Sequence, residues 1–129
     1  GWKELPASGI RLAYFKIEKQ YKNAEISITS FPGKTGDLLS NINRWRGQLQ
    51  LEPILLNDIS TFTEIIKNHS PELTIVRLKN KATKQATTAA LVQIKGNSWF
   101  IKLTGNSTIV SEEDSRFINF VKTLQFNEN

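Results

Sequence analysis

The order in which two hydrophobic periodicities follow one another is the feature that most limits the fold of this chain. Alternation along the chain, typical of half-buried β-strands, occurs in two stretches, 11–18 and 24–31. Three further strand signals follow at 73–79, 87–95 and 98–104. Helical spacing of apolar residues occurs in three: 37–49, 57–71 and 111–124. The chain therefore reads as two strands, two helices, three strands and a final helix.

Each helical stretch carries start or stop signals. Asp37 and Asn57 stand where N-cap residues belong, and Pro71 closes the second helix. Ser111 begins the last helix, and the acidic residues 112–114 complement the positive end of its dipole. These signals place the helix boundaries.

The order of elements predicts an α+β fold, an antiparallel β-sheet covered by helices with the order ββααβββα. Strands and helices do not alternate regularly, which excludes a doubly wound parallel sheet. With 129 residues and 39% hydrophobic content, the chain is sized for one domain spanning residues 1–129. Residues 1–10 are expected to form a loose entry segment.

The helical stretch 37–49 contains an unusual density of polar side chains around a tryptophan. Its apolar stripe holds Trp45 among leucines and isoleucine at spacings of three and four. The candidate residues for ligand or partner binding are Asn41, Asn43, Arg44, Trp45, Arg46 and Gln48. On a structural interpretation, Trp45 is core and the arginines are solvated or paired nearby; on a functional one, the segment is a recognition face.

The two arginines of this stretch project to different sides of the helix. Positions two apart are separated by about 200°, so Arg44 and Arg46 are not expected to grip one anion together. Arg44, next to Asn41 on the helix surface, is the better candidate for a carboxylate or phosphate, because its planar fork suits such groups.

Seventeen basic and twelve acidic residues give a net charge of +5, which permits anionic partners without selecting one. The densest basic group comprises Arg77, Lys79, Lys81 and Lys84. We interpret it as a solvated hairpin tip whose charges discourage edge-to-edge association; the alternative is attachment to lipid head groups or nucleic acid. Nucleic acid is disfavoured because exposed aromatic residues are not interleaved with these cations.

Signatures of catalysis are missing from the sequence. There is no cysteine, and His69 is the only histidine, which disfavours a metal site or a catalytic triad. Residues 32–36 superficially resemble a phosphate loop, but Ile28 stands where the Walker pattern needs glycine. We therefore expect no enzyme activity, metal or cofactor.

Four short segments carry a resemblance to a known family: 1–4, 11–13, 41–51 and 99–105. They are similar to a family of uncharacterised bacterial exported proteins and lipoproteins, and the order of elements resembles the PsbP-like fold of photosystem accessory proteins. Members of that family commonly contain the motif NVNRWRGQLGLPP. Here Gln50 replaces the glycine, and Glu52 and Pro53 replace the double proline, so the turn after the helix is expected to differ.

The resemblance implies an exported protein, periplasmic or membrane-anchored, and no known activity. The absence of methionine and the Gly-Trp-Lys start indicate a trimmed fragment, with any signal or anchor upstream. The sequence thus predicts a non-catalytic binding or assembly module of the bacterial cell envelope. It would present the helix at 41–48, or the cleft between that helix and the sheet, to an envelope protein or a small ligand.

Overall fold

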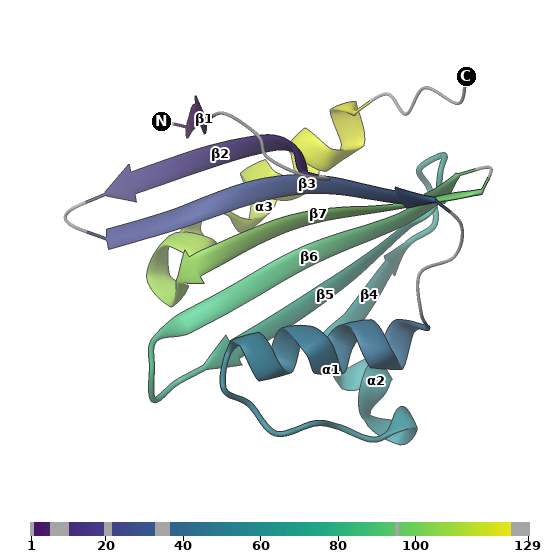
Figure 1. Cartoon of the computed structure of the whole chain (residues 1–129), viewed down its shortest axis with the longest axis horizontal. Coiled ribbons are helices and arrows are strands. Elements are labelled where there is room, and N and C mark those ends of the chain that lie inside the picture. Colours follow the sequence, from purple (N-terminus) through teal and green to yellow (C-terminus); the bar gives the residue numbers. More distant parts are fainter. Residues whose placement is uncertain (1, 6–10, 20–21, 33–36, 95, 125–129) are drawn as a thin grey trace.

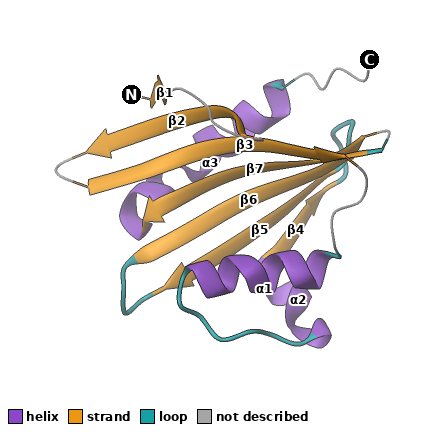
Figure 2. Ribbon diagram, in the orientation of Figure 1, coloured by secondary structure: helices purple, strands orange, loops and turns teal. Residues whose placement is uncertain are grey.

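The computed structural model describes residues 2–5, 11–19, 22–32, 37–94 and 96–124. Seven strands form one sheet in the order β1-β2-β3-β7-β6-β5-β4, and every neighbouring pair is antiparallel (Figure 2). The strands are β1 (Trp2–Leu5), β2 (Arg11–Lys19), β3 (Lys22–Pro32), β4 (Thr63–Ile66), β5 (Leu73–Asn80), β6 (Gln85–Ile94) and β7 (Asn97–Asn106).

Helices lie on both faces of the sheet (Figure 1). One face carries α1 (Leu38–Gln48), the 3-10 turn η1 (Leu56–Asp58) and the short α2 (Ile59–Phe62). The other face carries α3 (Ser107–Thr123). The prediction of an α+β fold, with an antiparallel sheet covered by helices, is confirmed.

The alternation of side chains along the central strands divides the core in two. On β5, Ile75 packs under α3, whereas Val76 and Leu78 pack under α1. Successive residues of a strand point to opposite faces, so a strand covered on both sides needs apolar residues at consecutive positions. The larger cluster, on the α3 side, contains Phe117; the smaller one, on the α1 side, contains Trp45.

The second helix is much shorter than the sequence predicts. The pattern at 57–71 predicted one helix, but α2 ends at Phe62 and the chain continues as β4, which pairs with β5 from Thr63 to Ile66. Short helices gain most of their stability from packing; as a strand, 63–66 instead extends the sheet by pairing with β5 and packs Ile66 against the larger core cluster. That part of the helix prediction is wrong.

Two further boundaries differ from the predictions. Residues 2–5 were expected to be loose, yet they form β1, paired with β2 from Trp2 opposite Ile17; residues 6–10 lie outside the described part.

The last helix begins before Ser111: the side chain of Asn106 accepts hydrogen bonds from the backbone amides of Thr108 and Ile109, at 3.0 and 3.3 Å. An N-cap preceding the one predicted therefore starts α3.

Candidate functional site

Trp45 anchors α1 to the sheet. Its side chain is only 1% exposed, and its ring meets the ring of Phe100 on β7 edge to face, with centroids 5.9 Å apart. Ile42 and Leu49, on the same stripe of α1, join it in the smaller core cluster. The structural interpretation of Trp45 is therefore sufficient to explain its presence.

Two other residues of the α1 segment fix the loop that follows the helix. The side-chain amide of Asn43 donates to the carbonyl oxygen of Ile54 at 3.1 Å and accepts from the backbone amide of Ile54 at 2.8 Å. Arg46 donates through Nε to the carbonyl oxygen of Glu52 at 2.6 Å. Its guanidinium also lies over the ring of Phe62, 5.1 Å from the centroid. Asn43 and Arg46 thus act in folding.

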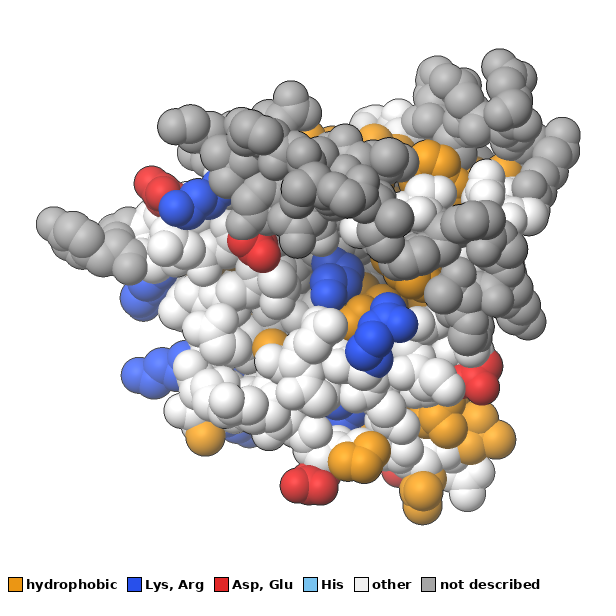
Figure 3. Space-filling model, viewed as in Figure 1, with side chains coloured by type: hydrophobic (Ala, Val, Ile, Leu, Met, Phe, Trp, Pro, Cys, Tyr) orange, Lys and Arg blue, Asp and Glu red, His pale blue; other side chains and the backbone are white. Residues whose placement is uncertain are grey.

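Arg44 is arranged differently. It is exposed, and its guanidinium carbon lies 5.6 Å from the ring centroid of Trp45 and 5.7 Å from that of Phe100. Within the described residues no carboxylate pairs with it. Lys102 approaches the same tryptophan ring, with Nζ 5.7 Å from its centroid, and donates to Oε1 of Gln48 at 3.0 Å. In Figure 3, basic side chains gather near the middle of this face.

A cleft of about 380 Å³ lies between the first turns of α1 and the sheet. Two buried polar residues, Asn41 and Ser98, line it, with exposed fractions of 4% and 2%. The full lining comprises Asp37, Leu38, Asn41, Glu72, Thr74, Leu91, Val92, Gln93, Ser98 and Phe100. Phe100 also supports the guanidinium of Arg44, although Arg44 itself is not among the residues that line the cleft.

The structure separates Arg77 from the lysines with which the sequence grouped it. Arg77 donates to both carboxylate oxygens of Asp114, at 3.0 Å each, and to Glu64 at 2.7 Å. The hydrogen bonds to Asp114, followed by the bond to Glu64, raise the pKa of Arg77 above its usual range. Lys79, Lys81 and Lys84 are exposed at the hairpin between β5 and β6. An anionic-surface role would rest on these lysines alone.

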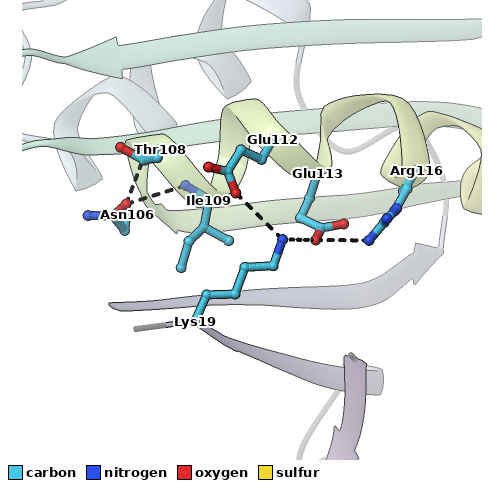
Figure 4. A network of polar contacts seen from close by, with 7 residues as sticks. All are labelled: Lys19, Asn106, Thr108, Ile109, Glu112, Glu113 and Arg116. Atoms are coloured by element: carbon cyan, nitrogen blue, oxygen red, sulfur yellow. Dashed lines mark hydrogen bonds and ion pairs between the residues drawn. The ribbon is translucent and has the colours of Figure 1, made fainter. Parts of the chain in front are cut away.

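The acidic residues at 112–114 lie more than one turn beyond the start of α3 at Ser107. Glu113 is a buried residue of α3, its side chain 2% exposed, and its Oε1 lies 2.6 Å from Nζ of Lys19 and 3.4 Å from Nη1 of Arg116 (Figure 4). Glu112 lies 3.6 Å from the same ammonium group. The prediction that these residues complement the positive end of the helix dipole is therefore wrong, and Glu113 instead forms a buried ion pair. Its partner Lys19 comes from β2, far away in the sequence, and no local pattern indicates that pairing.

We expect the contribution of Lys19 to stability to disappear at high pH. The hydrogen bond to Glu113, more than the nearby charges of Glu113 and Glu112, raises the pKa of Lys19 above its ordinary value. A basic group whose pKa is raised on folding stabilises the folded state. This stabilisation is complete at pH values below the unfolded-state pKa, about 10.4 for lysine, and it is lost as the pH rises through the folded-state pKa. Urea unfolding of the wild type and Lys19→Gln should give a free-energy difference that shrinks above that pH. A difference unchanged in strongly alkaline solution would contradict the pairing.

His69 has a structural setting. Its Nδ1 lies 2.8 Å from the carbonyl oxygen of Pro71, and its Nε2 lies 3.0 Å from that of Lys122, in the last turn of α3. It thus ties the turn between β4 and β5 to the end of α3. Among the described residues, no three His, Cys, Asp or Glu side chains are grouped as a metal site would need.

No family model and no curated protein sequence matches the chain. None of the helices in the described part combines the length and apolar character of a membrane crossing. The site must therefore be interpreted from its own geometry. Asn41 and Phe100 line the cleft, Arg44 lies over the rings of Trp45 and Phe100, and Gln48 accepts a hydrogen bond from Lys102 beside the ring of Trp45.

Proposed function

We propose that this chain is a non-catalytic binding module that takes a small ligand in the cleft beside α1, with Arg44 holding an anionic group of that ligand. The observation that carries the proposal is the setting of Arg44. It is exposed, supported by two aromatic rings, of which Phe100 also lines the cleft, and paired with no carboxylate in the described part of the chain.

The aromatic rings under Arg44 prepare it for binding. A guanidinium stacked on rings retains its five donors and has fewer orientations to lose when an anion binds. Carboxylate and phosphate groups match its fork with two parallel hydrogen bonds. Lys102 adds a second positive charge over the same Trp45 ring, which strengthens the local attraction for an anion.

The cleft offers the rest of the site. Leu38, Leu91 and Phe100 supply apolar wall, while Asn41 and Ser98 supply polar atoms. Small-molecule sites commonly combine a mainly apolar lining with a few placed polar groups. A hollow of about 380 Å³ falls within the usual size range of such sites.

We further propose that the module works in the bacterial cell envelope, as an exported and periplasmic or lipid-anchored protein with a PsbP-like arrangement. The resemblance of segments 1–4, 11–13, 41–51 and 99–105 to exported bacterial proteins supports this context. The partner would be a small ligand or another envelope protein. Attachment to lipid head groups or nucleic acid through Lys79, Lys81 and Lys84 is the weaker alternative, since Arg77 is engaged in ion pairs.

Arg44→Ala tests the proposal, with Arg46→Ala as the matched control on the same helix. In an NMR screen of small carboxylates and phosphates, we expect cleft residues to shift, and Arg44→Ala to weaken binding about tenfold, as losing a charge-assisted hydrogen bond does. Arg44→Ala should leave the free energy of unfolding within about 0.5 kcal/mol of the wild type, as surface changes do.

Arg46→Ala should show the opposite behaviour. It loses the bond to the carbonyl of Glu52 and the contact with Phe62, so stability should fall by about 1 kcal/mol while affinity is retained. If no anion in the screen shifts the cleft residues of the wild type, or if both variants bind as the wild type does, the assignment to Arg44 is wrong.

A further inference from the structure

A second hollow, of about 570 Å³, lies between α3 and the edge of the sheet formed by β4. Its walls come from β4, from the turn that follows β4, from Arg77 on β5 and from the part of α3 that begins at Asp114. It shares no lining residue with the cleft beside α1. It is therefore a separate candidate site.

The two carboxylates in the lining of this hollow are both engaged by one guanidinium. Arg77 donates to the two carboxylate oxygens of Asp114, at 3.0 Å each, and to Oε1 of Glu64 at 2.7 Å. One positive charge thus offsets most of the field of two negative charges. The remaining cations of the lining decide which ligands the hollow attracts.

These remaining cations are Lys67 and Lys122. Neither pairs with a carboxylate within the described residues. His69, two residues after Lys67, holds their segments together, because its Nε2 lies 3.0 Å from the carbonyl oxygen of Lys122. Two ammonium groups around one hollow repel each other, and an anion bound between them would relieve that repulsion.

The rest of the lining offers neutral donors and apolar surface. The side chains of Asn68, Ser115 and Asn119 line the hollow, and amide and hydroxyl groups can donate to anionic oxygens. Ile65 and Ile118 line it as well. Ile65 is 49% exposed, one of the few large hydrophobic side chains left open to solvent in the described part of the chain. A ligand suited to this lining combines an anionic head with an apolar body.

We infer that this hollow binds a phosphate monoester with an apolar substituent, the phosphate lying between Lys67 and Lys122 and the substituent against Ile65 and Ile118. A phosphate monoester carries about 1.5 to 2 negative charges at neutral pH and has three strong acceptor oxygens. It therefore matches two ammonium groups, whereas a single carboxylate has charge for only one. The inference is independent of Arg44 and of the ligand proposed for the cleft beside α1.

NMR titration of the wild-type chain with phenyl phosphate at pH 8 and low salt tests this inference. We expect the backbone amides of Asn68, Ser115 and Asn119 to shift. Benzoate, which has less charge, and inorganic phosphate, which lacks the ring, should each bind about fivefold more weakly, the range for losing one partly exposed charge contact or a small apolar contact. If phenyl phosphate shifts none of these amides, or binds no better than benzoate, the inference is wrong.

Substitutions of exposed lysines identify the groups that hold the phosphate. Lys67→Ala and Lys122→Ala should each weaken binding of phenyl phosphate about fivefold. Lys81→Ala is the matched control, because Lys81 is also exposed but does not line the hollow. If Lys81→Ala weakens binding as much as the other two variants do, the attraction is that of the net charge alone and the site is refuted.

Two further variants separate this site from its surroundings. Glu64→Gln removes a carboxylate from the lining and should strengthen binding of phenyl phosphate about twofold; a weakening would contradict the charge argument. Arg44→Ala should bind phenyl phosphate in this hollow as the wild type does, even where it loses small anions from the cleft beside α1. Loss of the shifts at Asn68, Ser115 and Asn119 in Arg44→Ala would assign them to the cleft and overturn the inference.

Phosphate monoesters occur both as soluble molecules and as lipid head groups. Co-sedimentation with phosphatidylcholine vesicles that contain phosphatidate distinguishes these two sources. Sedimentation that requires both phosphatidate and Lys67 and Lys122 supports the site with a lipid as its ligand. Phenyl phosphate binding without sedimentation supports it with a soluble ester. Sedimentation that Lys67→Ala and Lys122→Ala leave unchanged, together with unshifted amides in phenyl phosphate, would overturn it.

Discussion

Trp45→Ala is expected to lower the free energy of unfolding by about 3–5 kcal/mol, the usual cost of truncating a buried large aromatic side chain. The ring is 1% exposed and packs edge to face on Phe100. It is also the largest member of the smaller core cluster, and few neighbours are available to collapse into the space it would leave. The substitution would remove the ring that supports both Arg44 and Lys102.

Urea unfolding followed by circular dichroism measures this effect, with Trp99→Ala as the control. Trp99 is only half-buried and packs at the margin of the larger cluster, so its truncation should cost clearly less. Trp45→Phe, which keeps an aromatic ring, should recover a substantial part of the loss. If Trp45→Ala proves no more destabilising than Trp99→Ala, α1 is not held to the sheet in the way the structure shows.

Gly105→Ala is expected to destabilise the protein by about 2–5 kcal/mol, through backbone strain and steric overlap together. Gly105 has a φ of +144°, and a β-carbon there would lie 2.5 Å from the carbonyl oxygen of Asn23 and 2.6 Å from Cα of Ala24. Both contacts are with backbone atoms, which no side-chain rotation relieves. Gly105 is paired with Ala24 on β3 and Ala86 on β6, so relief would disturb two strand pairs.

Gly47→Ala is the matched control for this substitution. Gly47 lies in α1, and a β-carbon there would have no atom within 4 Å. Alanine favours helix over glycine by about 0.8–1 kcal/mol, so Gly47→Ala should be neutral or stabilising in thermal unfolding. If Gly105→Ala melted at the wild-type temperature, the close approach of β7 to β3 would be wrong.

The sequence predicted the elements whose pattern is local and long. The strands paired as β2–β3 and β5–β6–β7 are each eight to eleven residues long, and α1 and α3 carry continuous apolar stripes. The boundaries were harder where two signals compete. Ser111 and the acidic residues after it imitate a helix start, yet the turn before them is also helical because Asn106 provides its cap. Cap-like residues inside a helix conceal its true beginning.

The segment around β4 was mispredicted because its apolar residues fit both periodicities. Ile59, Phe62, Ile65 and Ile66 have helical spacing, and only the proximity of β5 decides in favour of a strand. A strand of four residues has no intrinsic signal strong enough to compete. The strand β1 is a similar case, because it also has only four residues and pairs with β2.

The candidate site was partly predictable. The sequence selected Arg44 over Arg46 from helix geometry, and the structure gives these two residues the different settings expected. It did not reveal Phe100 and Lys102 as neighbours of Arg44, since they arrive from β7. Nor did it reveal the roles of Asn43 and Arg46, whose partners are backbone groups of a loop. The spacing of apolar residues along the sequence does not indicate which side chains contact distant strands or backbone atoms.

The position of β7 between β3 and β6 also determines how the sheet is assembled. The β2–β3 hairpin closes locally, but it joins the remaining strands only through β7, so residues such as Thr29 and Phe100, 71 positions apart, must meet first. Closing so long a loop costs entropy before the contacts repay it. We therefore expect the N-terminal hairpin to join the sheet late in folding, after β7 has paired with β6.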